Sequence, residues 1–210
     1  MNIEERYGTL RTVVRRIARI AGAYNPRGIK IRFVNATNDG GFDGIVTEEQ
    51  VETCLDTVVP KGGTQLGTRL VTKVIQPLIL DRARRGELDR PVVVIIVTDG
   101  EPSGEDEDML KNAILATKNE LSKHSCGRSS YGPSSVVFHI ARVGTSSKAK
   151  SFVRSLEEDE EVNDLLFSTD ESLDWALGEA QSRGQLNTWV SSLEASDRIG
   201  WRGANGWWGI

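Results

Sequence analysis

The chain has 210 residues, of which 38% are hydrophobic and 27% are charged, and its net charge is -4. This length and composition predict one globular domain with a real core, and they exclude a disordered, collagen-like or coiled-coil chain. No apolar run approaches the roughly 18 residues of a membrane span. The start, MNIEER, lacks the apolar region of a secretory signal. We therefore expect a cytoplasmic protein without a membrane partner.

The two cysteines, Cys54 and Cys126, lie far apart and belong to no CxxC pair. Neither a disulfide framework nor a zinc site is therefore predicted.

Basic residues are concentrated near the start, where residues 1–30 hold seven Lys or Arg against two acids. Four of them, Arg11, Arg15, Arg16 and Arg19, fall on one side of a predicted helix and have no aromatic residues between them. A nucleic-acid surface usually combines basic residues with aromatic ones. We expect a solvated helix face and no nucleic-acid partner.

The first half of the chain contains three predicted helices and one strand. Apolar residues at helical spacing predict a helix over 9–24, and alternation of apolar and basic residues predicts an edge strand over 29–35. Thr47 and Gln50 form a capping-box pattern for a helix that ends before Pro60. A longer helix is predicted from Leu66 to Gly86, with a kink at Pro77.

The second half begins with the clearest strand, the β-branched run Val92–Val97. Such a run is typical of a central parallel strand covered on both faces. The remaining expected elements are a helix over 105–122, a strand over 135–143, a helix over 147–157, a strand over 165–167 and a helix over 170–183. This alternation predicts an α/β fold, a doubly wound and mostly parallel sheet with helices on both faces.

The last residues, 184–210, are predicted to be a separate C-terminal extension that is rich in Trp and Gly. Four of the five tryptophans lie there. Rings of this size favour an extension that packs on the domain or on a partner. A membrane anchor is disfavoured because no cluster of Lys or Arg accompanies the aromatic residues.

Two loops are candidates for function. Asp99 follows the clearest strand directly, at the carboxyl edge where ligands bind in doubly wound sheets. A plain Asp-Gly turn would explain it equally well. The second loop, GGTQLGT, contains Thr64, but Thr68 occupies the position where a phosphate-binding loop needs lysine. Nucleotide binding is therefore not expected.

These two strings, GGTQLGT and VIIVTDGEP, resemble the von Willebrand factor A (vWA) domain, and they look most similar to vWA-like proteins of fungi. The resemblance covers about Arg6 to Gly178, so residues 1–183 are assigned to the vWA-like domain. It implies a metal-ion-dependent adhesion site in which Thr64 binds Mg²⁺ directly and Asp99 holds it directly or through water. Oxygen ligands of this kind suit a hard cation.

The chain departs from the family at its start, because the first strand and its D-x-S-x-S loop do not fit into MNIEERYG. The alternative string over 170–174, DESLD, is better explained as a helix N-cap with acids in the first turn. With those ligands missing, we expect Mg²⁺ to bind weakly or not at all. The neighbouring strands must then pair directly or leave a gap. The explanations are a truncated chain or, less simply, a strand donated by a partner.

Three functions remain open. The leading one is a non-enzymatic protein-binding module that uses the loop face at Thr64 and Asp99, which the acidic run over 105–108 could make more negative. The second is a Mg²⁺-dependent hydrolase or phosphoryl-transfer enzyme that uses Asp99. The third is a scaffold without any active site. No catalytic constellation is recognised, since neither His124 nor His139 accompanies an evident nucleophile and carboxylate.

Overall fold

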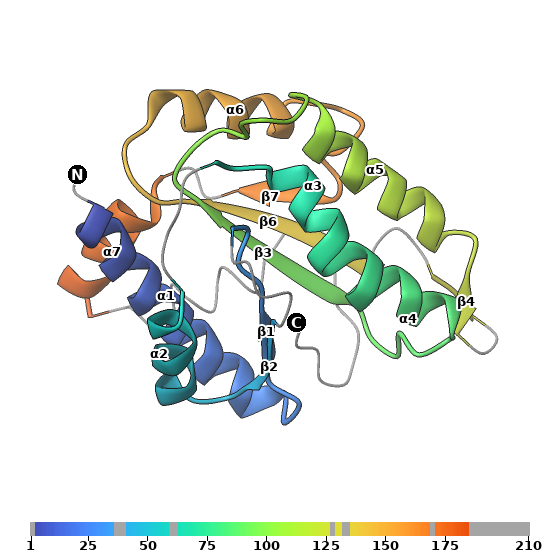
Figure 1. The fold of residues 1–210 in the computed structure, drawn as a ribbon, viewed down its shortest axis with the longest axis horizontal. Coiled ribbons are helices and arrows are strands. Elements are labelled where there is room, and N and C mark those ends of the chain that lie inside the picture. The colour runs from blue at the N-terminus through green and yellow to red at the C-terminus, as the bar shows by residue number, and fades with distance from the viewer. Residues whose placement is uncertain are drawn as a thin grey trace.

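The computed structural model describes residues 3–35, 41–58, 63–126, 129–131, 135–168 and 171–184 (Figure 1). In chain order the elements are α1 (Ile3–Tyr24), β1 (Ile29–Ile31), β2 (Phe42–Ile45), α2 (Glu48–Asp56), α3 (Leu66–Leu70), the π-helix η1 (Val71–Leu80), α4 (Asp81–Arg84), β3 (Val92–Thr98), α5 (Met109–Leu121), β4 (Ser125–Cys126), β5 (Ser129–Ser130), β6 (Val136–Arg142), α6 (Ser147–Glu157), β7 (Leu166–Ser168) and α7 (Leu173–Ser182). The tryptophan-rich extension predicted beyond Gly184 lies outside these residues.

Three parallel strands form the main sheet, in the order β3-β6-β7. β3 and β6 pair over their full lengths, from Val92 opposite Val136 to Thr98 opposite Arg142. Parallel neighbours need a crossover connection, which the segments containing α5 and α6 supply. Two antiparallel pairs, β1 with β2 and β4 with β5, lie outside this sheet. The predicted α/β class is confirmed for the part of the chain that the structure describes.

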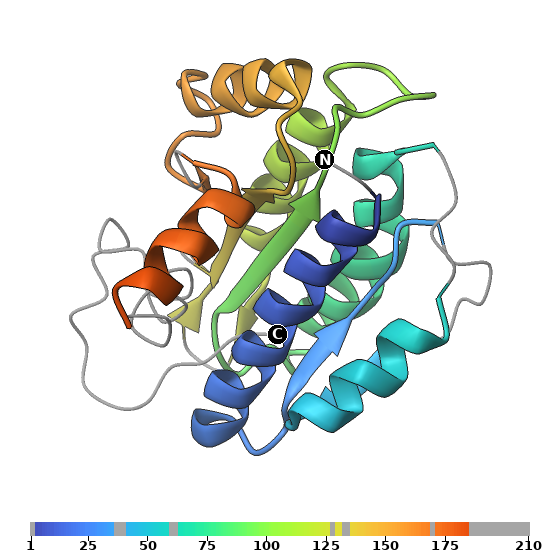
Figure 2. The ribbon, with the colours of Figure 1, turned by 90° about the vertical axis from the view of Figure 1, so that its left-hand side faces the viewer.

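Each face of the main sheet carries its own hydrophobic core. On β3, Val94 and Ile96 belong to the core that includes α3, η1 and α5, whereas Ile95 and Val97 pack against the core that includes α1 and α2. Figure 2 shows α1 and α7 on one side of β3 and the α3 to α5 segment on the other. The unbroken β-branched run fits this position because alternate side chains serve opposite cores.

β3 is not the central strand that the sequence predicts. Within the described residues it is an outer strand, and β6 is its only strand partner. β1 runs beside it in the same direction (Figure 2), but β1 pairs with β2 and not with β3. Of the two expected arrangements of these strands, direct pairing or a gap, the described residues show the gap.

The strand predicted over 29–35 is shorter than expected, because β1 ends at Ile31 and residues 34–35 form a turn. Its partner β2, which the sequence did not predict, begins at Phe42, and Ile31 opposite Phe42 is the last pair. Beyond that pair, neither β1 nor β2 continues as a strand in the described chain. β1 therefore ends opposite the residue at which its antiparallel partner begins.

The helix predictions are accurate where local signals are strong. The capping box of Thr47 and Gln50 is present at α2, and α6 has the predicted bounds. α1 begins at Ile3, earlier than expected, and α5 begins only at Met109. The acidic run over 105–108 therefore precedes α5 and is not its first turn. None of the described helices combines the length and the apolar character needed to span a membrane.

The helical path predicted from Leu66 continues through Pro77 to Arg84, but its middle part, η1, is a π-helix. Proline has no N–H to donate and its ring clashes with the carbonyl of the residue four positions earlier in an α-helix. The wider π-turn relieves that contact. The proline at which the sequence predicts a kink thus lies within a segment of changed helix type.

The clustered arginines of α1 are partly exposed, as a solvated face would be, and they also pair with acids on α2. Arg15 Nη2 lies 2.9 Å from Glu48 Oε2. The further pairs are Arg11 with Glu52 and Asp56, Arg15 with Glu52, and Arg16 and Arg19 with Glu48.

Cys54 is buried on the inner side of α2, where burial raises the pKa of its thiol.

Candidate functional site

The two loops singled out in the sequence meet at the carboxyl edge of β3. The backbone N–H of Thr64 donates to Ser103 Oγ at 3.0 Å, and the N–H of Ser103 donates to the Thr64 carbonyl at 2.9 Å. Gln65 adds a third link, because its side-chain amide donates to the Gly104 carbonyl at 3.0 Å. The loop before α3 and the loop after β3 therefore form one hydrogen-bonded unit, which we call the loop face.

Two glycines permit this arrangement. Gly63 has a φ of +88° directly before Thr64, and Gly104 has a φ of +73° directly after Ser103. Residues with a Cβ rarely adopt such angles. The reciprocal bonds between Thr64 and Ser103 thus depend on a sharp backbone turn beside each of them.

The side-chain carboxylate of Glu105 also connects these two loops. Its two carboxylate oxygens accept the backbone N–H groups of Gly67 and Thr68, at 2.8 and 2.9 Å. From the sequence, Glu105 is seen only as part of an acidic run, and Ser103 is not singled out. The signal for them is a hydroxyl and an acid three and five residues after Gly100, at the edge where the Thr64 loop is also expected.

Asp99 lies at the beginning of this unit, immediately after the last residue of β3, and it is exposed. The turn at Asp99 is fixed by its neighbours, since the Thr98 hydroxyl donates to the Gly100 carbonyl at 2.9 Å. Thr64 is half-buried. The structure thus places both predicted residues on the loop face, and Ser103 is the residue in the loop of Asp99 that is bonded to Thr64 itself.

The donor set of this face does not fit Mg²⁺ well. No group of three or more His, Cys, Asp or Glu side chains that could hold a metal ion occurs among the described residues. The carboxylate of Glu105 already accepts a backbone N–H on each of its two oxygens, from residues that follow Thr64. Mg²⁺ requires nearly octahedral oxygen coordination. Thr64 and Asp99 alone would leave most of that coordination to water.

The alternative acidic string does not supply the missing ligands. Ser172 is the N-cap of α7 and accepts the N–H of Trp175, as expected for a capping motif. The Asp174 carboxylate accepts the Thr9 hydroxyl at 2.6 Å and also bonds to the backbone N–H of Gly144. Asp174 therefore joins α7 to α1 and to the end of β6. Asp170 lies outside the described residues.

The charges near the loop face are of both signs. Glu101 lies 3.4 Å from Lys148 at the start of α6, in an exposed ion pair. The two histidines lie elsewhere, since His139 is buried in β6 and His124 is 3.4 Å from Glu120 at the end of α5. The face is thus a polar surface held together by backbone bonds.

No family model, no curated protein and no solved structure matches this chain. The class that the fold defines is an α/β protein with a parallel three-stranded sheet and a hydrogen-bonded loop face at the end of β3.

Proposed function

We propose that this chain is a non-enzymatic protein-protein interaction module of the vWA type, in which the loop face at Thr64 and Asp99 binds a protein partner. The observation that carries the proposal is the reciprocal hydrogen bonding of Thr64 and Ser103 at the carboxyl edge of β3. In α/β folds this edge is the usual place for recognition, and a loop held on a rigid scaffold is a usual recognition element.

The order of the elements supports the vWA type and a doubly wound arrangement. A long helix, a short strand, the Thr64 loop, β3 with Asp99, and β6 follow one another as the resemblance implies. In this proposal the first strand is absent and the metal-ion-dependent adhesion site is incomplete. The partner is then recognised mainly through direct contacts with the exposed loop residues.

The alternative, a Mg²⁺-dependent hydrolase or phosphoryl-transfer enzyme using Asp99, has no specific observation in its favour. A hydrolytic site needs a nucleophile or an activated water together with a positioned acid or base. Glu105, the acid bonded to the Thr64 loop, is held by two backbone N–H groups. We therefore retain the binding module as the proposed function.

Site-specific photo-crosslinking tests the proposal. A photoreactive amino acid is placed at exposed Asp106, in the loop after β3, and, as the matched control, at exposed Glu87 after α4. Position 106 is chosen so that the bonds between Thr64 and Ser103 stay intact. In extracts of the source organism, we expect a discrete protein adduct from position 106 and none from position 87. The adduct should be lost in the Asp99→Ala variant. Equal adducts from both positions, or an adduct that survives Thr64→Ala combined with Asp99→Ala, would contradict the proposal.

Calorimetric titration with Mg²⁺ and Mn²⁺ examines the incomplete metal site separately. We expect no binding at micromolar affinity, because Thr64 and Asp99 supply too few ligands to offset dehydration of the ion. Binding at micromolar concentration that disappears in Asp99→Ala would show that the site is functional.

A further inference from the structure

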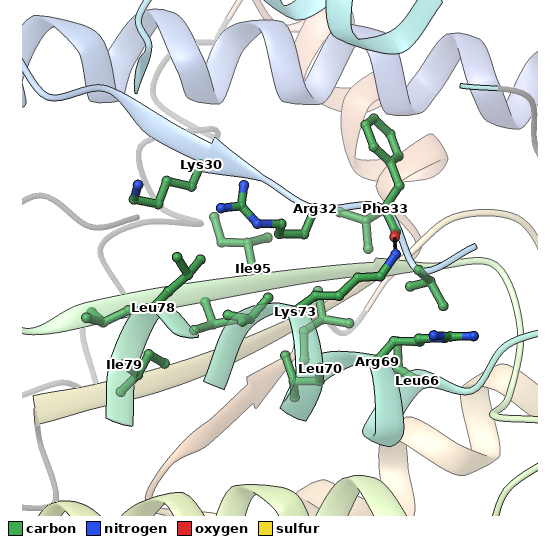
Figure 3. Close-up of a pocket in the computed structure, with 16 residues that line it drawn as sticks. Lys30, Arg32, Phe33, Leu66, Arg69, Leu70, Lys73, Leu78, Ile79 and Ile95 are labelled. Atoms are coloured by element: carbon green, nitrogen blue, oxygen red, sulfur yellow. Dashed lines mark hydrogen bonds between the residues drawn. The ribbon is translucent and has the colours of Figure 1, made fainter. Parts of the chain in front are cut away.

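A cavity of about 120 Å³ lies between β1 and β3 and is bounded on a third side by α3 and η1 (Figure 3). Residues of β3 from Val92 to Val97 line it, and Lys30 and Arg32 line it from the side of β1. Leu70 and Ile79 form part of its apolar floor. We call this space the β1–β3 groove.

The groove lies along the outer edge of β3. β6 occupies the other edge of β3, and no described strand pairs with the outer one. Such an edge presents a row of backbone N–H and C=O groups that can pair with an added strand. Across the groove, the Phe33 carbonyl accepts a hydrogen bond from Lys73 Nζ at 2.7 Å, drawn as a dashed line in Figure 3. A side chain from η1 thus reaches the segment that follows β1.

The charge of the groove has one sign. Four basic side chains line it and no acidic residue does; they are Lys30, Arg32, Arg69 and Lys73. Lys30 and Arg32 pair with Asp43, which lies outside the lining. Arg69, in contrast, forms no ion pair within the described chain. In Figure 3, Arg69 and Lys73 lie toward the same end of the groove as Phe33, and Lys30 lies toward the other.

We propose that the β1–β3 groove accepts an extended segment of a partner protein, which adds as a strand parallel to β1 and β3. Its side chains are apolar on both faces, because the two cores of the sheet lie on either side of the groove. Acidic residues follow toward its carboxyl end, where they meet Arg69 and Lys73. This is a second interaction surface, separate from the loop face.

The occupant must open the groove further. Two strands that flank a third stand about 9–10 Å apart, and the present cavity of about 120 Å³ is smaller than a strand. Lys73 must leave the Phe33 carbonyl, and the β1–β2 hairpin must move away from β3. No hydrogen-bonded ladder joins the described parts of that hairpin to β3, so the movement breaks no strand pairing.

The test uses the full chain and a synthetic peptide of seven apolar, β-branched residues, the length of β3, followed by two glutamates and attached to a soluble carrier. We expect saturable binding by calorimetry and a thermal midpoint several degrees higher at about 100 times Kd. A peptide ending in two lysines should bind about tenfold more weakly. A glutamate peptide methylated at alternate backbone nitrogens should not bind, because it cannot complete the ladder.

Arg69→Glu provides the matched reversal of charge, since Arg69 is exposed and its replacement should not prevent folding. This variant should lose the preference for the glutamate peptide, because a carboxylate then lies beside the remaining Lys73. The control Arg85→Glu, also exposed but outside the groove, should behave as the wild type. Asp99→Ala should bind the glutamate peptide normally, which separates this surface from the loop face.

Three results would overturn the proposal. Equal binding of the methylated peptide would show that no strand forms. Absence of binding by any peptide, with aggregation of Arg69→Glu, would mean that the basic side chains only protect an exposed edge. A dimer of the full chain that Arg69→Glu abolishes would assign the groove to a second copy of this chain.

Discussion

The carboxylate of Glu105 shows how a single residue determines the geometry of the loop face. It is bonded to two consecutive backbone N–H groups, of Gly67 and Thr68, and it lies only two residues beyond Ser103. Hydrogen bonds to a charged acceptor are stronger than those between neutral groups. Glu105 therefore fixes the beginning of α3 and, through the short connection, the position of Ser103 beside Thr64.

Replacement of Glu105 should measure this effect. We expect Glu105→Ala to lower the free energy of unfolding by about 1–3 kcal/mol, because two backbone donors lose a charged acceptor. Glu107→Ala is the control, since Glu107 is exposed and lies in the same loop. Urea denaturation followed by circular dichroism gives both values. Equal stability of the two variants would mean that Glu105 does not hold the loops together.

Close packing of α3 against α5 depends on the absence of a side chain at Gly67. A Cβ at this position would lie 2.7 Å from the backbone nitrogen of Leu110 and 2.7 Å from the carbonyl carbon of Met109. Such distances require the helices to separate. By contrast, a Cβ at Gly178 in α7 would meet nothing within 4 Å.

Replacing these two glycines by alanine should change the free energy of unfolding in opposite directions. Gly67→Ala should destabilise the fold by about 1–3 kcal/mol through overpacking, whereas Gly178→Ala should stabilise it by up to about 1 kcal/mol through helix propensity. Thermal unfolding of both variants under the same conditions is the measurement. A neutral Gly67→Ala would indicate that α3 and α5 can separate without cost.

The ends of α4 and α5 are joined by Glu120, which accepts bonds from Lys123 and Arg84 at 2.9 and 3.1 Å. These bonds, with a further one from His124, lower the pKa of Glu120 from 4.5 to about 2. A carboxyl whose pKa is lower in the folded state stabilises that state above its unfolded pKa. The contribution is lost as the pH falls through the folded value.

The pH dependence of Glu120→Gln follows from this sign. The difference in unfolding free energy between wild type and variant should be constant above about pH 5 and should shrink as the pH falls from 4.5 to about 2. Denaturation curves at successive pH values give the difference. Asn119→Ala, at the exposed neighbouring position, is the control, and its difference should not vary with pH because neither side chain is titratable. A difference that stays constant down to pH 2 would contradict the role assigned to Glu120.

At the scale of the whole molecule, the sequence predicts the parts that are fixed by local patterns. The run Val92–Val97 predicted β3, and Thr47 with Gln50 predicted the start of α2, because each signal lies within a few residues. The strand order could not be deduced in the same way. Whether Val92–Val97 lies at the centre or the edge depends on a neighbour distant in sequence.

The candidate site also has parts that local sequence patterns predict and parts that depend on contacts distant in sequence. Asp99 and Thr64 are candidates because each lies beside a local signal, a strand end or a glycine-rich loop, within strings that resemble the vWA motifs. The sequence contains no local sign that Glu105 would turn toward Gly67 and Thr68 rather than begin a helix. That choice depends on the approach of two loops whose members lie 37 or 38 positions apart.

The separation of the β1–β2 hairpin from the main sheet has a consequence for how cooperatively the molecule unfolds. β3, β6 and β7 are joined by backbone ladders, but no ladder joins β1 or β2 to them in the described chain, where side chains of β1 and β2 pack against the shared core. Segments joined without shared ladders can open independently. Amide hydrogens of β1 should therefore exchange through a low-energy partial opening, whereas those of Phe138 and Ile140 exchange only when the whole domain unfolds. Native-state hydrogen exchange at increasing denaturant should resolve two units, and one common opening free energy would show a single unit.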